Sequence, residues 1–143
     1  KQQVEDIFTK EQLDKAVKLE AYELGSCIFI NNRKGGFERR ALPAAAQLSP
    51  MYGIAIADLD EDGNQDILLG GNFYQAKPEA GIYDASYGLV LKGDGVGNFA
   101  VVSAQQSGIH IRGAVRDIII LQTSKKKQIL YACNNDKLYI YQH

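Results

Sequence analysis

Four aspartates recur at short, regular spacing in one stretch of the chain. Asp58, Asp60, Asp62 and Asp66 occupy positions 1, 3, 5 and 9 of this run, and Gly63 lies among them. Carboxylates this close together repel one another unless a cation lies between them. Hard Ca²⁺ takes roughly six to eight oxygen ligands, which a sharply turned backbone can supply from several carboxylates and a carbonyl. The spacing therefore predicts a calcium-binding loop.

The residues around the loop argue against an EF-hand. An EF-hand needs a bidentate acid at about position 12 of its loop and a helix on either side, whereas Leu69 stands at that position here. The flanking residues 53–57 and 67–71 are short apolar runs bounded by glycine, which is typical of buried strands. We expect the metal to brace a turn between two strands. A solvated acidic turn without metal is the alternative.

The loop and its preceding strand, Gly-Ile-Ala-Ile-Ala at residues 53–57, resemble the FG-GAP or VCBS repeat. That repeat is the calcium-bearing blade unit of integrin-type β-propellers. A wider resemblance covers most of the chain and points to the end of long bacterial VCBS-repeat proteins of the ASPIC/UnbV and cartilage-acidic-protein group. It rests on residues 37–43, 47–50, the acidic run, 71–74 and 84–88.

This resemblance implies a set of calcium ligands. They are the side chains of Asp58, Asp60, Asp62 and Asp66 and the backbone carbonyl of Asn64. It also implies an exported bacterial protein that works outside the cell, on its surface or in the periplasm. A weak site made only of oxygen ligands suits the high calcium concentration found there.

Composition limits the remaining possibilities. The chain has 143 residues, 45% of them hydrophobic and 23% charged, with a net charge of −1, so one folded core is expected and disorder is not. The only cationic run is residues 125–127, which makes nucleic acid a poor partner. No apolar run approaches the roughly 20 residues that span a bilayer. Because the chain begins at Lys1, we expect it to be part of a longer precursor.

The acidic loop must be positioned by strands, and the pattern predicts one helix before them. Residues 10–24 place apolar side chains at three- and four-residue spacing, after a capping box formed by Thr9 and Gln12. Residues 1–25 are therefore predicted to be a helical lead-in. The apolar face of this helix is expected to pack on the β-structure, and a partner-binding helix is the minor alternative.

From residue 26 onward the chain reads as strands and turns that recur after about 60 residues. The predicted fold is all-β, with about two to two-and-a-half four-stranded propeller blades. Residues 26–43 form a half blade, 53–103 the calcium-bearing blade and 113–143 a degenerate last blade. The repeat aligns Gly53 with Gly113, Asp58 with Asp117 and Asn72 with Asn134. Since Asp117 is followed by isoleucines and then lysines, one calcium site is expected. Residues 118–121 are predicted to be an inner strand covered on both faces.

Residues 72–88 form a long connection that carries aromatic side chains. Rings beside polar groups suit sugars or a protein partner, so the candidate ligand-binding residues are Phe73, Tyr74, Tyr83 and Tyr87. The alternative is that these rings are buried as local core. The two cysteines, Cys27 and Cys133, lack zinc-site spacing and could pair or remain free.

The enzyme hypothesis has few candidate catalysts, because the only histidines are His110 and His143. We therefore expect a non-enzymatic, calcium-stabilised propeller segment that acts as an extracellular binding or scaffold module, the C-terminal piece of a longer protein. The alternative is a carbohydrate-recognition or carbohydrate-processing surface on the 72–88 loop. Open sheet edges predict edge-to-edge self-association of the chain, while the protein or glycan partner is not specified.

Overall fold

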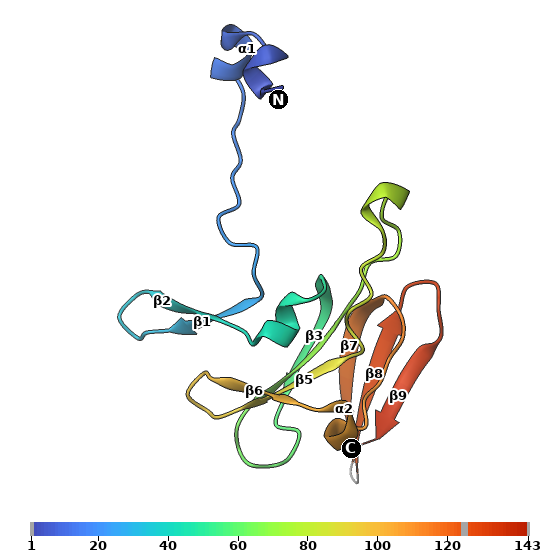
Figure 1. Cartoon of the computed structure of the whole chain (residues 1–143). Helices are drawn as coiled ribbons and strands as arrows, with labels where there is room; N and C mark the ends of the chain where they lie inside the picture. Colours follow the sequence, from blue (N-terminus) through green and yellow to red (C-terminus); the bar gives the residue numbers. More distant parts are fainter. Residues whose placement is uncertain (1, 124–125, 143) are drawn as a thin grey trace.

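A computed structural model describes residues 2–123 and 126–142 of the chain. Its strands form three antiparallel sheets, and in each sheet the strands follow one another in sequence order (Figure 1). The hairpin sheet contains β1 (Cys27–Asn31) and β2 (Phe37–Ala41). The central sheet contains β3 (Met51–Ala57), β4 (Asp66–Gly71), β5 (Leu89–Gly93) and β6 (Phe99–Val102). The last sheet contains β7 (Val115–Gln122), β8 (Lys127–Cys133) and β9 (Leu138–Gln142).

The remaining elements are short helices. They are the 3-10 turns η1 (Val4–Asp6), η2 (Ala44–Gln47) and η3 (Pro78–Ala80), with the α-helices α1 (Lys10–Asp14) and α2 (Ala104–Ser107). The all-β class is thus confirmed. In the described part of the chain, no helix has both the length and the hydropathy needed to cross a membrane.

The middle of the central sheet, at β4, is covered on both faces. One face contributes Leu68 and Val90, which pack with Ile118, Ile129 and Tyr131 of the last sheet. The opposite face packs in a second cluster with the hairpin sheet and η2, formed by Leu42, Ala46, Ile67, Leu69 and Leu91. Every residue of β4 is buried, which explains why its sequence is continuously apolar after Asp66. The strand that follows the acidic loop therefore anchors the loop in the core.

Two glycines allow the central and last sheets to approach closely. A Cβ atom added at Gly70 would lie 2.5 Å from Cγ1 of Val115, and one added at Gly53 would lie 2.8 Å from Cγ1 of Ile118. Real side chains do not make such contacts. Small residues on β3 and β4 are thus required where β7 packs.

Asn72 connects three separate parts of the chain. It has a left-handed φ of 83° and is almost completely buried. Its Nδ2 donates to the carbonyls of Ser86 (2.6 Å) and Gly113 (3.0 Å), while its Oδ1 accepts from the Ser86 amide and the Ser49 hydroxyl, both at 2.9 Å. Every hydrogen-bonding position of this side-chain amide is therefore used. Asn72 fixes the start of the 72–88 loop against the last sheet.

The predicted helix over residues 10–24 is much shorter in the structure. The helix begins at Lys10 behind the expected Thr9–Gln12 capping box but ends at Asp14. None of its residues is buried, and short helices need tertiary packing to persist in water. Most of the lead-in predicted for residues 1–25 is consequently not helical, and residues 17–24 have no regular structure.

The last sheet corrects a second expectation. Residues 118–121 do form part of a strand, but that strand is covered on one face only. Ile118 is 4% exposed and faces the central sheet, whereas Ile119 is 49% exposed. Successive side chains of a strand point to opposite faces, so a continuous apolar run does not require two covered faces.

The pairing registers also correct the repeat alignment. In both β3–β4 and β7–β8 the register shifts just after the first pair, between Met51 and Gly53 and between Val115 and Asp117. Counting from these shifts, Leu121 corresponds to Ala57, Gln122 to Asp58 and Gln128 to Asp66. Asp117 lies within β7 opposite Ala132 and is not the counterpart of Asp58. The alignment of Asn72 with Asn134 is retained, since their amides donate to the equivalent carbonyls of Pro50 and Ala114.

Candidate metal centre

The acidic loop joins β3 to β4 and brings three of the four aspartates together. Asp58, Asp60 and Asp66 each offer a carboxylate oxygen, and these oxygens lie within 4.8 Å of one another. Asp66 is buried, Asp58 is half-buried and Asp60 is exposed. Three carboxylates at this separation could hold a metal ion.

Asp66 is the fixed member of the acidic triad, which we define as Asp58, Asp60 and Asp66. Its Oδ2 accepts from the Leu59 amide and its Oδ1 from the Gly93 amide, both at 2.9 Å. Hydrogen bonds to a carboxylate are stronger than those between neutral groups. Asp66 therefore holds the start of the loop against the end of β5 in addition to offering a metal ligand.

The other two members are oriented by the loop's own backbone. Asp58 accepts from the amides of Asp62 (3.1 Å) and Gly63 (2.9 Å), and Asp60 accepts from the Asp62 amide at 3.3 Å. Gly63 has a φ of 88° and Glu61 a φ of 63°, in the left-handed region that glycine adopts most readily. The sharp turn expected at Gly63 is confirmed, and it folds the backbone around the carboxylates.

Asp62 and Asn64 lie beside the triad. Asp62 Oδ1 accepts from the Asn64 amide at 2.8 Å, and Asp62 Oδ2 pairs with the ammonium of Lys92 at 2.9 Å. The Lys92 hydrogen bond and then the Asn64 amide hold the pKa of Asp62 below its ordinary value. Asp62 thus pairs with Lys92 of β5 and lies outside the group of three converging carboxylates.

Sequence reasoning missed two lysines at this site. Lys92 on β5 bridges Asp60 and Asp62, and these hydrogen bonds raise its pKa, that from Asp60 most. Lys127, at the start of β8, donates to the Asp58 carbonyl at 2.6 Å and lies 3.5 Å from the Glu61 carboxylate. Lys92 lies 32 residues from Asp60, so only the pairing of β4 with β5 could have revealed it. Of the lysine run at 125–127, Lys125 lies outside the described residues.

The donor set suits a hard divalent cation. Every ligand atom that the triad offers is a carboxylate oxygen, the type that Ca²⁺ and Mg²⁺ prefer. Asp66 and the backbone hydrogen bonds preorganise the triad, and the side chain of Lys92 is 47% exposed and free to move into solvent. A cation among these oxygens would supply the charge that the Lys92 ammonium otherwise provides. The residues present therefore fit a metal ion.

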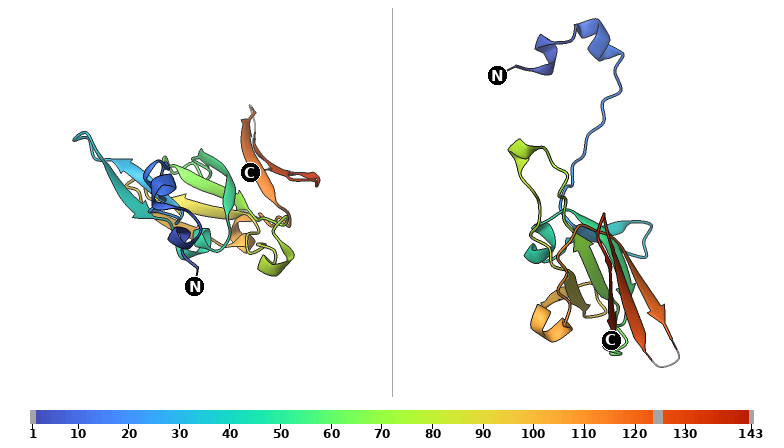
Figure 2. Two further views of the ribbon diagram at one scale, coloured as in Figure 1. Left: turned by 90° about the horizontal axis from the view of Figure 1, so that it is seen from above. Right: turned by 90° about the vertical axis from the view of Figure 1, so that its right-hand side faces the viewer.

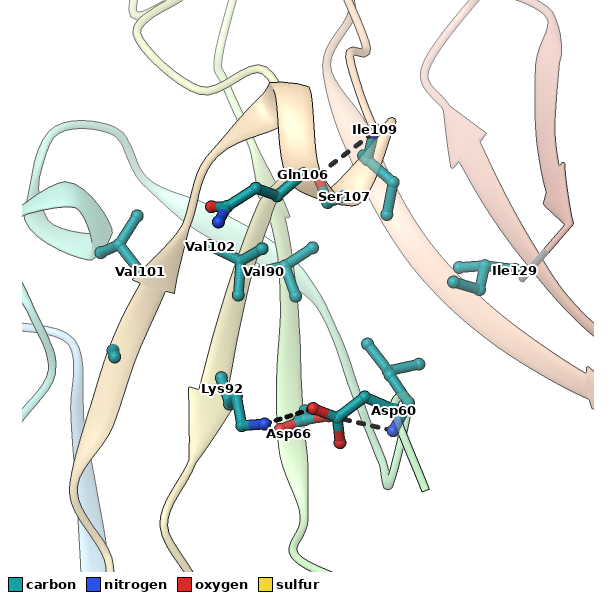
Figure 3. Close-up of a pocket in the computed structure, with 12 residues that line it drawn as sticks. Asp60, Asp66, Val90, Lys92, Val101, Val102, Gln106, Ser107, Ile109 and Ile129 are labelled. Carbon is teal, nitrogen blue, oxygen red and sulfur yellow. Dashed lines mark hydrogen bonds and ion pairs between the residues drawn. The ribbon is translucent and has the colours of Figure 1, made fainter. Parts of the chain in front are cut away.

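A cleft of about 380 Å³ lies between the central and last sheets next to the triad. Figure 3 shows Asp60, Asp66 and Lys92 at one end and Gln106 and Ser107 at the other. The side chains between these ends are mainly apolar and include Val90, Val102, Ile109 and Ile129. Asp60 and Asp66 of the triad thus lie with Lys92 at one end of an apolar cleft.

The aromatic loop places most of its rings in solvent. Phe73 and Tyr83 pair across the loop through backbone hydrogen bonds of 2.8 and 3.0 Å. Tyr74, Tyr83 and Tyr87 are exposed and Phe73 is half-buried. Tyr87 stacks on His110 with ring centroids 5.0 Å apart. The three tyrosines are therefore surface groups, not the buried local core that was the alternative.

Other candidate residues have separate surroundings. Ser107, close to His110 in sequence, accepts from the Ile109 amide at 3.2 Å through its hydroxyl, while the His110 ring lies on Tyr87. His143 lies outside the described residues. Cys27 and Cys133 are both free and half-buried, and burial raises the pKa of the Cys133 thiol.

Comparisons of the chain with models of protein families, with curated proteins and with solved structures gave no match.

Proposed function

We propose that this chain is a calcium-stabilised, propeller-type β module that serves in binding or as a scaffold. The observation that carries the proposal is the acidic triad, Asp58, Asp60 and Asp66, whose oxygens converge within 4.8 Å at the β3–β4 turn. Calcium is the chosen ion because Ca²⁺ accepts roughly six to eight oxygen ligands in variable geometry, whereas Mg²⁺ demands near-ideal octahedral geometry. Asp62 and the Asn64 carbonyl would complete the shell after Asp62 leaves Lys92.

The arrangement of the sheets supports the propeller-type reading. A four-stranded antiparallel sheet in sequence order is the unit of a propeller blade, and the central sheet has this order. Ile54 on β3 corresponds to Ile118 on β7. Ile118 is covered by the preceding sheet in the chain, the central sheet, whereas Ile54 is 58% exposed. The sheet that precedes Ile54 is the two-stranded hairpin sheet. Two further strands beside β1 would cover Ile54 as the central sheet covers Ile118. The hairpin sheet would then be half of a blade and the last sheet three-quarters of one.

The proposed role of the metal is structural. Four carboxylates around an ion leave little space for a substrate, and calcium acidifies bound water weakly compared with zinc. We accordingly assign the module to binding and not to catalysis. An oxygen-only site of modest affinity works best where calcium is abundant, which favours a protein exported to the cell surface, the periplasm or the medium.

Calorimetric titration with Ca²⁺, together with thermal melts in calcium and in chelator, tests this proposal. We expect one bound ion and a higher melting temperature in calcium, and Asp60→Asn should abolish both effects. Asp84→Asn is the matched control, because it removes a carboxylate from the aromatic loop and leaves the triad intact. A melting temperature that does not respond to chelator, or equal responses to the two variants, would contradict the metal site.

A carbohydrate-binding surface is a second candidate, favoured by the exposed Tyr87–His110 stack. Flat rings with hydrogen-bonding groups at their edges suit sugar rings, and Tyr74 and Tyr83 lie exposed on the same loop. Glycan-array binding that disappears in Tyr87→Ala, with an unchanged melting temperature, would support this function. Tyr22→Ala is the control, since Tyr22 is an exposed tyrosine outside the loop.

A further inference from the structure

Residues 17–24 leave the body of the protein as an extended chain with apolar side chains in solvent. Val17 is 85% exposed, and Leu19, Tyr22 and Leu24 are each 89% exposed. Within the described part of the chain, no backbone N–H or C=O of residues 17–24 has a hydrogen-bond partner. Figures 1 and 2 show this stretch carrying α1 away from the sheets. The stretch is extended and pairs with no sheet in the described part of the chain.

A sheet edge that lacks a partner lies on the far side of the molecule. β9 pairs with β8 on one side and has no described strand on the other. Natural edges are usually protected by proline, bulges or covering elements, but β9 reads Leu-Tyr-Ile-Tyr-Gln and pairs without a register shift. Its outward side chains Leu138 and Ile140 are exposed and continue the apolar row of Ile119 and Leu130.

We propose that residues 17–24 of one copy add as a fourth strand to the free edge of β9 in a second copy. An extended segment gains affinity at an open edge from backbone hydrogen bonds and specificity from alternate side chains. Val17, Leu19 and Ala21 alternate with Lys18, Glu20 and Tyr22. Pleating would therefore set the three apolar side chains beside Leu138 and Ile140.

The charges of the two surfaces are complementary. Residues 17–24 contain Lys18, Glu20 and Glu23, a net charge of −1. The β8–β9 region, residues 126–142, contains Lys126, Lys137 and Asp136, a net charge of +1 when Lys127, which donates to the Asp58 carbonyl, is left out. Attraction of this kind speeds encounter and opposes the alternative of β9 pairing with a second β9.

The acceptor is a second copy because the segment is anchored on the opposite side of its own molecule. Gln47 holds Ser26 through bonds of 2.7 and 2.8 Å to its amide and carbonyl, and Glu23 pairs with Arg39 of β2 at 2.6 Å. The hairpin sheet and the last sheet lie at opposite ends of the molecule in Figures 1 and 2. Reciprocal exchange would close a dimer, whereas one-way addition would build an open chain.

Sedimentation of the full chain over a wide concentration range, combined with amide exchange, tests the proposal. We expect the mass to rise with concentration and the β9 amides to become protected over the same range. Leu19→Pro should abolish both effects without changing the melting temperature, because Leu19 packs on nothing. Leu138→Lys should also abolish both by placing a charge on the acceptor. Val96→Lys, at another exposed apolar residue, on the β5–β6 turn, is the control and should associate normally.

Three results would overturn the inference. A chain that stays monomeric at every concentration with fast exchange in β9 would show that the edge binds no second copy. A monomer whose β9 protection is lost in Leu19→Pro would show that the segment pairs within its own molecule. Association that survives both Leu19→Pro and Leu138→Lys, or is lost in Val96→Lys, would show that other apolar surfaces drive it.

Discussion

The β3–β4 and β7–β8 hairpins share one backbone plan but differ in what joins their strands. Each has a register shift after its first pair, and each is closed at the opposite end by an asparagine amide bonded to a backbone carbonyl. In β3–β4 an eight-residue connection, residues 58–65, carries the acidic loop. In β7–β8 only residues 123–126 lie between the last paired residues. The acidic triad therefore depends on the longer connection, which supplies Asp58 and Asp60, and on Asp66 at the start of β4.

The two hairpins also differ at two flanking residues, the first residue of the connection and the first residue after it. Gln122 and Gln128 stand where β3–β4 has Asp58 and Asp66, so oxygen atoms remain but the negative charge is gone. Lys127 of the second hairpin instead donates to the Asp58 carbonyl of the first. The second hairpin thus contributes a positive charge to the acidic loop.

The largest difference is expected between Ile118 and its counterpart Ile54. Ile118→Asp would bury an unpaired carboxylate against the central sheet, which costs about 3 kcal/mol or more, and should prevent folding. Ile54→Asp should leave a folded protein, because Ile54 is more than half exposed. Circular dichroism and thermal melts of the two variants measure the difference. Equal loss of structure in both would show that Ile54 is also buried in solution.

Asn72→Ala should be nearly as severe, since it leaves partners in three segments without their hydrogen bonds. Buried groups left unpaired cost about 1–3 kcal/mol each, so we expect a loss on the order of 3 kcal/mol in urea unfolding. Asn134→Ala is the comparison. Asn134 is exposed, and its backbone amide, which the substitution leaves in place, makes the bond equivalent to that of the Asn72 amide. A small effect at Asn72 would mean that water replaces its side chain.

Asp66→Ala separates the structural role of the loop from metal binding. Two buried amides, of Leu59 and Gly93, lose their acceptor, so stability should fall by about 2 kcal/mol even in chelator. In calcium the loss should be larger, because an ion at 100 times its dissociation constant adds about 2.7 kcal/mol to the wild type. Gln128→Ala, at the equivalent position, should behave alike in calcium and in chelator. An Asp66→Ala effect seen only in calcium would show that the hydrogen bonds of Asp66 do not stabilise the protein without metal.

Lys92→Met should have opposite effects on the apo and calcium-bound protein. In chelator the carboxylates of Asp60 and Asp62 lose their counterion and the melting temperature should fall modestly. In calcium titrations the affinity should rise several-fold, because the ion no longer competes with the ammonium. Lys34→Met, on the exposed β1–β2 turn, is the control.

The ion pair between Asp62 and Lys92 predicts that the stability of the protein in chelator depends on pH. The pKa of Asp62 is lowered in the folded state, so its contribution is present above the ordinary carboxylate pKa and is lost as pH falls through the lowered value. The pKa of Lys92 is raised, so its contribution persists through neutral pH and is lost only in strong alkali. The difference in melting temperature between wild type and Lys92→Met should therefore be constant near neutrality and shrink in acid.

The smallest effect is expected when Gln122→Asp and Gln128→Asp are combined. They restore the flanking carboxylates of the first hairpin, but the short connection offers no counterpart of Asp60. We expect the number of calcium ions bound per chain to stay unchanged in calorimetry. A second bound ion would show that flanking carboxylates are sufficient and that the connection is not decisive.

Local patterns predicted the strands and the all-β class. Glycine-bounded apolar runs located the strands, and the Thr9–Gln12 box located the start of α1. The helix end was missed because periodicity shows which face could be buried but not whether anything covers it. The one-sided burial of Ile119 was missed for the same reason.

The candidate site was predictable where its members are close in sequence. Asp58, Asp60 and Asp66 share one turn, so their spacing sufficed. Lys92 and Lys127 reach the site through strand pairing and sheet packing, which spacing cannot reveal. The repeat alignment failed because Gly113 was equated with Gly53, whereas the pairing registers make Asp117 the counterpart of Gly53 and Gln122 the counterpart of Asp58.

Asn72 also bears on the order in which the chain folds. Its side chain and carbonyl bond to groups 14 to 44 residues away, whereas each strand pairs with a neighbour in sequence. Contacts between distant residues must overcome loop-closure entropy before they contribute, and they slow folding. The hairpins can therefore form early as local units, and the closure of Asn72 onto Ser49, Ser86 and Gly113 becomes the late step that commits the sheets to one another.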